Sequence, residues 1–183
     1  MKIIGFKNSN TEDLVKYTIS LFENKDSEII DLCEFKNEFT TNSNAFLQKV
    51  KEARFLIISL TNDNFLVTIE DWLKKIVNKD AFNDTALFLL YTSDEENEQP
   101  KVLTITKAQF SSYGAEVLDT FHLPKFNKNF DSKIGITDIK LSLEFIRKIN
   151  TIKQNNFNNY FKKVVSTCGI DNTGFENCDA SSY

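Results

Sequence analysis

The residues with the clearest chemical potential lie near the N-terminus, in the stretch Lys7–Asp13. It combines hydroxyl, amide and carboxylate side chains, and it separates an apolar run over 2–6 from apolar residues at helical spacing over 14–22. A turn between a strand and a helix can hold a phosphate, because backbone N–H groups at the start of the helix point toward the anion. This turn contains no glycine, and it ends in the carboxylates Glu12 and Asp13. The stretch therefore predicts a phosphate site that has changed or been lost.

Two later segments, 61–67 and 92–100, also each follow an apolar run that is typical of a buried strand. Ligands of parallel sheets lie beyond the carboxyl ends of the strands, so we expect all three loops to surround one ligand. The segment 92–100 carries four acidic residues, which would repel a phosphate. Alternatively, these acids precede Pro100 and favour the start of a helix through its dipole. The candidate ligand-binding residues are Ser9, Asn10, Thr11, Thr61, Asn62, Asp63, Asn64, Thr92 and Ser93.

The elements that must position these loops alternate along the chain. Strands are predicted at 2–6, 27–32, 55–60, 86–91 and 116–118, and helices at 14–22, 43–50, 68–77, 102–113 and 139–149. Such alternation predicts right-handed βαβ units around a parallel sheet. Five strands in this rhythm predict an α/β, flavodoxin-like three-layer sandwich, with a five-stranded parallel sheet and helices on both faces.

Composition limits the classes of function. The 183 residues fit one domain of ordinary size, and the net charge of −4 argues against a nucleic-acid partner. No apolar stretch approaches the roughly 18 residues of a membrane span, so we expect a soluble, cytoplasmic protein with no membrane partner. His122 is the only histidine, which argues against a His-based metal site. We expect His122 to be a structural residue near the sheet edge.

The chain changes character after residue 150. We expect a flavodoxin-like domain over 1–150, then an Asn-rich linker and a flexible Ser/Thr/Cys-containing tail over 151–183. Cys168 and Cys178 could form a disulfide, bind a metal or react in trans, although the absence of a nearby histidine argues against structural zinc. A further hypothesis makes the tail a segment that partner enzymes modify.

The chain resembles the NADPH-dependent FMN reductase family from about residue 1 to 149. The resemblance is carried by Ser9-Asn10-Thr11 after the first strand, by the segments 53–59 and 70–73, and most specifically by 121–131, FHLPKFNKNFD. It implies an FMN site at the three loops, NADPH as the electron donor and a homodimer. In all three loops, however, this sequence departs from the glycine-rich pattern of the family.

Three hypotheses about function follow. The first is a divergent reductase-like protein that has weakened or lost flavin binding and acts as a binding or scaffold module, a pseudoenzyme. The second is an active NAD(P)H-dependent FMN or quinone reductase, with FMN held by the candidate residues of the three loops. The third is a folded carrier that presents residues 166–183 to a partner protein.

Overall fold

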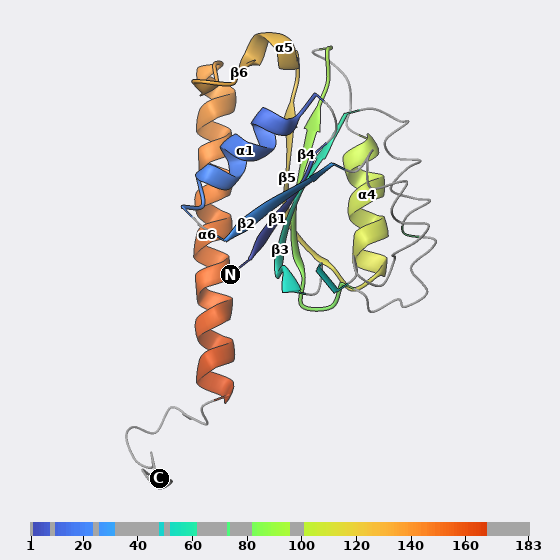
Figure 1. The fold of residues 1–183 in the computed structure, drawn as a ribbon, viewed down its shortest axis with the longest axis vertical. Coiled ribbons are helices and arrows are strands. Elements are labelled where there is room, and N and C mark those ends of the chain that lie inside the picture. Colours follow the sequence, from blue (N-terminus) through green and yellow to red (C-terminus); the bar gives the residue numbers. More distant parts are fainter. Residues whose placement is uncertain are drawn as a thin grey trace, which may run out of the picture.

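A single parallel sheet organises the chain. The computed structural model describes residues 2–7, 10–23, 26–31, 48–49, 52–61, 73, 82–95 and 101–167, with side chains described through residue 155. Its strands are β1 (Ile3–Lys7), β2 (Ser27–Asp31), β3 (Phe55–Leu60), β4 (Ala86–Thr92) and β5 (Glu116–Leu123). Their order is β2-β1-β3-β4-β5, and every neighbouring pair is parallel. The predicted five-stranded parallel sheet is confirmed (Figure 1).

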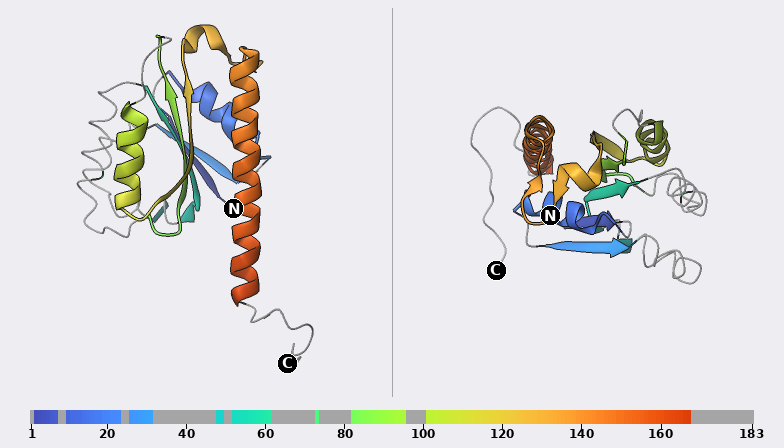
Figure 2. Two further views of the ribbon diagram at one scale, coloured as in Figure 1. Left: turned by 180° about the vertical axis from the view of Figure 1, so that it is seen from behind. Right: turned by 90° about the horizontal axis from the view of Figure 1, so that it is seen from above.

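Helices cover both faces of this sheet. The described helices are α1 (Glu12–Ser20), α4 (Lys101–Ser112), α5 (Phe126–Asn129) and α6 (Ile139–Thr167). Figures 1 and 2 show α1 and α6 on one face and α4 on the other, which confirms the three layers. A short antiparallel pair, β6 (Phe130–Asp131) and β7 (Gly135–Ile136), joins α5 to α6. Most of the helices expected at 43–50 and 68–77 lies outside the described residues.

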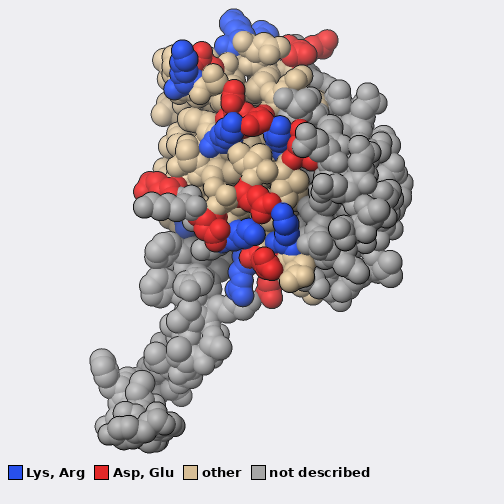
Figure 3. Space-filling view, viewed as in Figure 1, with Lys and Arg blue, Asp and Glu red and all other residues tan. Residues whose placement is uncertain are grey.

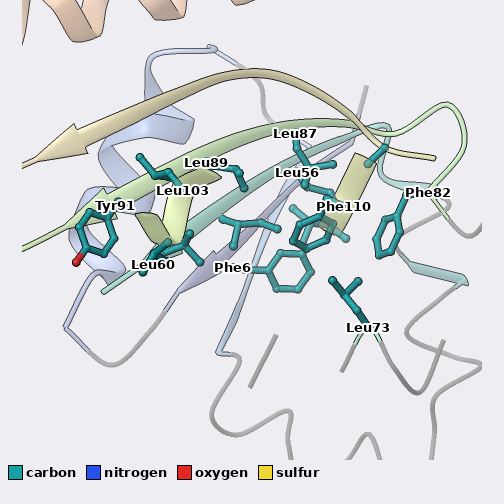
Figure 4. Close-up of a cluster of buried hydrophobic side chains, with 14 of the residues drawn as sticks. Phe6, Leu56, Leu60, Leu73, Phe82, Leu87, Leu89, Tyr91, Leu103 and Phe110 are labelled. Atoms are coloured by element: carbon teal, nitrogen blue, oxygen red, sulfur yellow. The ribbon is translucent and has the colours of Figure 1, made fainter. Parts of the chain in front are cut away.

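The sheet separates two hydrophobic cores because successive side chains of a strand point to opposite faces. Toward α4, Phe6, Leu56 and Tyr91 pack with Phe110 (Figure 4). Toward α1 and α6, the core includes Phe55, Ile57, Phe88, Phe121 and Phe145. All residues of β3 are buried, as its continuous apolar sequence predicts for a central strand.

Two elements are longer than their sequence patterns predict. β5 continues to Leu123 instead of ending at residue 118, and its polar Asp119 lies 2.8 Å from the Lys148 ammonium of α6. An edge strand tolerates such a carboxylate because one side of it stays open to water.

α6 continues through Thr167, so residues 151–167 form helix where an Asn-rich linker was expected. Ile152 is buried and continues the core-facing series of Phe145 and Ile149 at helical spacing. Asparagine has a modest helix propensity, but it does not break a helix as proline does. Residues 168–183 lie outside the described residues.

Candidate functional site

The candidate site lies at the carboxyl edge of the sheet. Strand pairing aligns Lys7 at the end of β1 with Asp31 of β2, and Thr92 at the end of β4 with Leu123 of β5. The described residues of the three predicted loops therefore start from one edge, because parallel strands all point the same way.

The first loop leads directly into α1. Asn10 is exposed in the turn, whereas Thr11 is fully buried at the N-cap position and its backbone carbonyl accepts a hydrogen bond from the Val15 N–H. The Thr11 hydroxyl does not cap the helix. Gly5 permits the close packing of α1 on β1, because a Cβ at this position would overlap the Val15 side chain. The start of α1 is thus held tightly against the end of β1.

A network of four charged side chains occupies this junction. Lys7 Nζ lies 2.7 Å from Glu12 Oε2 and 3.1 Å from Asp31 Oδ2. The second oxygen of Glu12 lies 2.6 Å from Lys16 Nζ, one turn along α1. The side chains of Lys7 and Asp31 are only 19% and 12% exposed, so their ion pair is partly shielded from water.

The network shifts the titration of its members. Hydrogen bonds from Lys16 and Lys7 lower the pKa of the Glu12 carboxyl to about 2. The hydrogen bond to Glu12, and then the one to Asp31, raise the pKa of the Lys7 ammonium above its ordinary value. Both groups are therefore charged at neutral pH, and two cations are balanced by two anions. Glu12 and Asp13 lie in the first turn of α1. Their carboxylates therefore already compensate the positive end of the helix dipole.

A phosphate does not fit this arrangement well. A helix N-terminus attracts an anion through free N–H groups and its dipole, and nearby cations strengthen that attraction. Here the Glu12 carboxylate would repel the phosphate, and Lys7 and Lys16 are already paired with carboxylates. On the face shown in Figure 3, basic and acidic side chains of the described residues likewise lie beside one another.

In the third loop, the predicted ligand-binding residues Thr92 and Ser93 contact other parts of the protein. Thr92 is buried, with its Oγ1 3.5 Å from the carbonyl oxygen of Leu60 on β3. Ser93 is also buried, and its backbone N–H donates to the carbonyl of Leu123 at 3.3 Å. Its own carbonyl accepts from the N–H of Phe126 at 2.9 Å. These bonds tie the end of β4 to the segment that follows β5.

The Ser93 hydroxyl also contacts the single histidine. Ser93 Oγ lies 2.8 Å from His122 Nε2 and donates to the backbone carbonyl of Glu95 at 3.0 Å. A hydroxyl has one proton, so we infer that His122 Nε2–H donates to Ser93. A histidine in this tautomer cannot deprotonate the serine, and the pair is not arranged as a nucleophile and base. His122 lies on the edge strand β5, where a structural role was expected.

Residues 121–131, FHLPKFNKNFD, form hydrogen bonds at the same edge of the sheet. Lys125 adopts a left-handed conformation with φ 47°, and Asn129 Nδ2 donates to the Pro124 carbonyl at 2.8 Å. Asn127 Nδ2 donates to Asp94 Oδ1 at 3.3 Å, which links α5 to the loop after β4. Sequence reasoning singled out this segment but missed its bonds to the third loop, because they join residues far apart in the chain.

The described residues bring only part of the predicted site together. Asn10, Thr11, Thr61, Thr92 and Ser93 lie in the first, second and third loops at this edge. The other candidates lie outside the described residues: Ser9, Asn62, Asp63, Asn64, Cys168 and Cys178.

Within the described part of the chain, no group of acidic, His or Cys side chains could hold a metal ion. No helix in that part has the length and apolar character needed to cross a bilayer.

The strand order and the layers define a protein with a flavodoxin-like fold. Among solved structures, an apo NADH:FMN oxidoreductase is similar, with 17% identity, a TM-score of 0.65 and coverage of 84% of this chain and 89% of that one. Flavodoxin 1 from Bacillus cereus is 12% identical over 82% of this chain and 96% of its own, with a TM-score of 0.54. General stress protein 14 from Treponema denticola, solved in complex with FMN, is 10% identical over 82% of this chain and 94% of its own, with a TM-score of 0.51.

At these identities the similarity establishes the fold and leaves the activity to be argued from the site. No protein-family model matches the sequence, and a search of curated proteins finds no match.

Proposed function

We propose that this chain is a divergent relative of the NADPH-dependent FMN reductases that has lost tight flavin binding and acts as a binding module. The charge network at the start of α1 carries the proposal. In it, the Glu12 carboxylate is held by Lys7 and Lys16 at 2.7 and 2.6 Å, in the first turn of the helix that follows the first strand.

Two further observations support the loss of flavin binding. The Thr92 and Ser93 side chains are buried, and the Ser93 hydroxyl is committed to Glu95 and His122. Releasing that hydroxyl for a ligand would break bonds that hold the loop. The similarity in fold to an NADH:FMN oxidoreductase and to flavodoxins supports descent from a flavin protein.

The proposal is tested by reconstitution. The purified protein is incubated with excess FMN, desalted, and examined for flavin absorbance. We expect a colourless protein, because among the described residues at the start of α1 a phosphate would meet the Glu12 carboxylate and two lysines that are already paired. A protein that emerges yellow, with stoichiometric flavin, would instead support an active NAD(P)H-dependent FMN or quinone reductase. Oxidation of NADPH or NADH by that yellow protein would decide the matter.

A further inference from the structure

Three strongly exposed apolar side chains lie close together in the sequence. Ile134, in the turn between β6 and β7, is 74% exposed, and Ile139 and Leu143, in the first two turns of α6, are 76% and 68% exposed. Single exposed apolar residues are ordinary on a protein surface, but a group of them marks a site of contact. These three residues fall within one segment of ten residues, so they call for a common explanation.

Hydrogen bonds hold the β6–β7 turn and the end of α5 close to the start of α6. The Thr137 hydroxyl donates to the Lys128 carbonyl at 3.1 Å, which joins α5 to the residues just before α6. The Asp131 carboxylate accepts the N–H groups of Lys133 and Ile134 at 2.9 and 3.0 Å, which fixes the turn. Figure 1 shows α5, β6 and the start of α6 together at one end of the molecule. The exposed apolar residues therefore belong to one corner of the domain.

Unpaired cations occupy the same corner. Lys128, Lys133, Lys140 and Arg147 are exposed, and none of them forms an ion pair with another described residue. Residues 125–148 include six basic and three acidic residues, a net charge of +3, in a chain whose net charge is −4. We call the four cations, together with Ile134, Ile139 and Leu143, the corner patch.

The carboxylates of this segment have other partners. Asp131 and Asp138 accept hydrogen bonds from backbone N–H groups, and Glu144 Oε1 lies 4.0 Å from Lys148 Nζ. These acids reduce the positive field of the corner, but an excess of basic charge remains. The charge of the corner patch therefore favours an anionic partner.

On α6, the apolar and basic members of the patch share one side of the helix. At 3.6 residues per turn, Ile139, Lys140, Leu143 and Arg147 fall within roughly 100° of its circumference. This side lies nearly opposite to the buried side that faces the sheet. Beyond Arg147, the exposed residues on this side are polar and uncharged: Asn150, Thr151 and Gln154. The patch is thus confined to the end of α6 that adjoins the β6–β7 turn.

We propose that the corner patch docks on the surface of a membrane that contains anionic lipids. Aliphatic side chains that enter the boundary between headgroups and acyl chains, flanked by lysine and arginine near the lipid phosphates, are typical of such a contact. Protein interfaces are instead enriched in aromatic residues and depleted in lysine, whereas three of the four cations here are lysines and the exposed apolar residues are aliphatic. The lack of a long apolar stretch argues against a membrane span and does not bear on a surface contact.

Docking at this corner would bring the candidate site near the membrane. The Phe126 N–H at the start of α5 donates to the Ser93 carbonyl at 2.9 Å, and Asn127 Nδ2 donates to Asp94 Oδ1 at 3.3 Å. The corner is therefore joined to the loop after β4, at the carboxyl edge of the sheet. The patch itself includes none of the candidate ligand-binding residues, so the proposal does not depend on whether flavin binds.

Co-sedimentation of the full chain with large lipid vesicles tests the proposal. At about 0.1 M salt, we expect the protein to sediment with phosphatidylcholine vesicles that contain about 30% phosphatidylserine. With vesicles of phosphatidylcholine alone it should remain in solution. Raising the salt to about 0.5 M should release the bound protein, because the shorter Debye length screens the cations from the lipid charge.

Removing charge from the patch should weaken this binding. Lys133→Gln together with Lys140→Gln should lower the partition coefficient roughly 30-fold, at about fivefold for each cation near the surface. Arg54→Gln together with Lys107→Gln is the matched control, because both residues are exposed, lie outside the patch and cause the same change in net charge. This control should bind as the wild type does.

Removing an apolar side chain from the patch tests insertion separately from charge. Ile134→Ser should lower the partition coefficient about tenfold or more, because the side chain no longer leaves water on binding. Ile105→Ser is the matched control: Ile105 is 42% exposed on α4, which covers the other face of the sheet (Figure 1). Both residues are exposed, so both variants should keep the wild-type far-UV circular dichroism.

A fluorescent probe reports the contact directly. With the native cysteines replaced by serine, Ile134→Cys carrying an environment-sensitive fluorophore should shift its emission to the blue on addition of the phosphatidylserine vesicles. The same label at Lys107→Cys should show no shift. A wild type that stays in solution with these vesicles, binding that survives Ile134→Ser, equal losses in the controls, or no blue shift at position 134 would overturn the proposal.

Discussion

If the charge network at the start of α1 weakens flavin binding, as proposed, replacing Glu12 with glutamine should increase the affinity for FMN. The substitution keeps the shape of the side chain and removes the carboxylate that lies 2.7 Å from Lys7 and 2.6 Å from Lys16. It leaves the Lys7–Asp31 pair in place. Lys16 and one side of Lys7 then become available to a phosphate at the start of α1.

The size of the gain follows from the charges. A unit repulsion at about 4 Å in bulk water corresponds to roughly a sixfold change in Kd. Because the Glu12 side chain is 39% exposed, water and ions screen its repulsion, so the bulk-water estimate is an upper value for the charge term. Together with the release of the two lysines from Glu12, we expect Glu12→Gln to lower the Kd for FMN by roughly two- to sixfold at low salt.

Quenching of FMN fluorescence on titration with protein provides the assay, and Glu116→Gln provides the matched control. Glu116 is exposed at the first residue of β5, and its replacement causes the same change in net charge. It lies at the opposite end of an eight-residue strand, roughly 25 Å from the carboxyl edge and beyond the Debye length at 0.1 M salt. Equal effects of the two variants, or no gain for Glu12→Gln, would refute the role assigned to the network.

Three further outcomes follow from the described packing and charges. Phe145→Ala should cost about 3–5 kcal/mol and lower Tm by roughly 6–20 °C in a thermal melt, because it empties a fully buried ring site, whereas the exposed Gln154→Ala on the same helix should leave Tm unchanged. Gly135→Ala should lower the urea midpoint by an amount equivalent to roughly 1–3 kcal/mol, because φ is +91° there and the new Cβ would lie 2.5 Å from the Tyr17 ring. Folding lowers the Glu12 pKa from 4.5 to about 2, so its contribution to stability is complete above pH 4.5 and is lost as the pH falls toward 2. The urea midpoint of the wild type should therefore fall more steeply over that pH window than that of Glu12→Gln, and parallel curves would contradict the pairing.

Much of the fold could be predicted from the sequence because its signals are local. The apolar runs over 55–60 and 86–91 indicate central strands without any knowledge of their partners, and all of their residues except Ala86 are buried. The end of α6 was predicted wrongly because the asparagines after residue 150 obscure a helical pattern that Ile152 continues. Whether a segment forms a helix depends on the packing of its apolar face as much as on the intrinsic helix propensity of its residues.

The candidate site was less predictable because its contacts join distant parts of the chain. Glu12 was identified as an unfavourable residue for a phosphate, but its link through Lys7 to Asp31 depends on the parallel pairing of β1 with β2. The contact between Ser93 and His122 likewise depends on the register of β4 and β5. The sequence predicts which residues lie at the edge of the sheet, but the pairing of the strands determines which of those residues bond to each other.

The equilibrium affinity of the wild-type protein for FMN tests the central claim most directly. Isothermal titration calorimetry in low-salt buffer at neutral pH would measure it, with riboflavin, which lacks the phosphate, as the comparison. If the phosphate site is lost, FMN should bind no more tightly than riboflavin, with any Kd above roughly 100 μM. A Kd for FMN below about 1 μM, together with much weaker binding of riboflavin, would show a working phosphate site and contradict the claim.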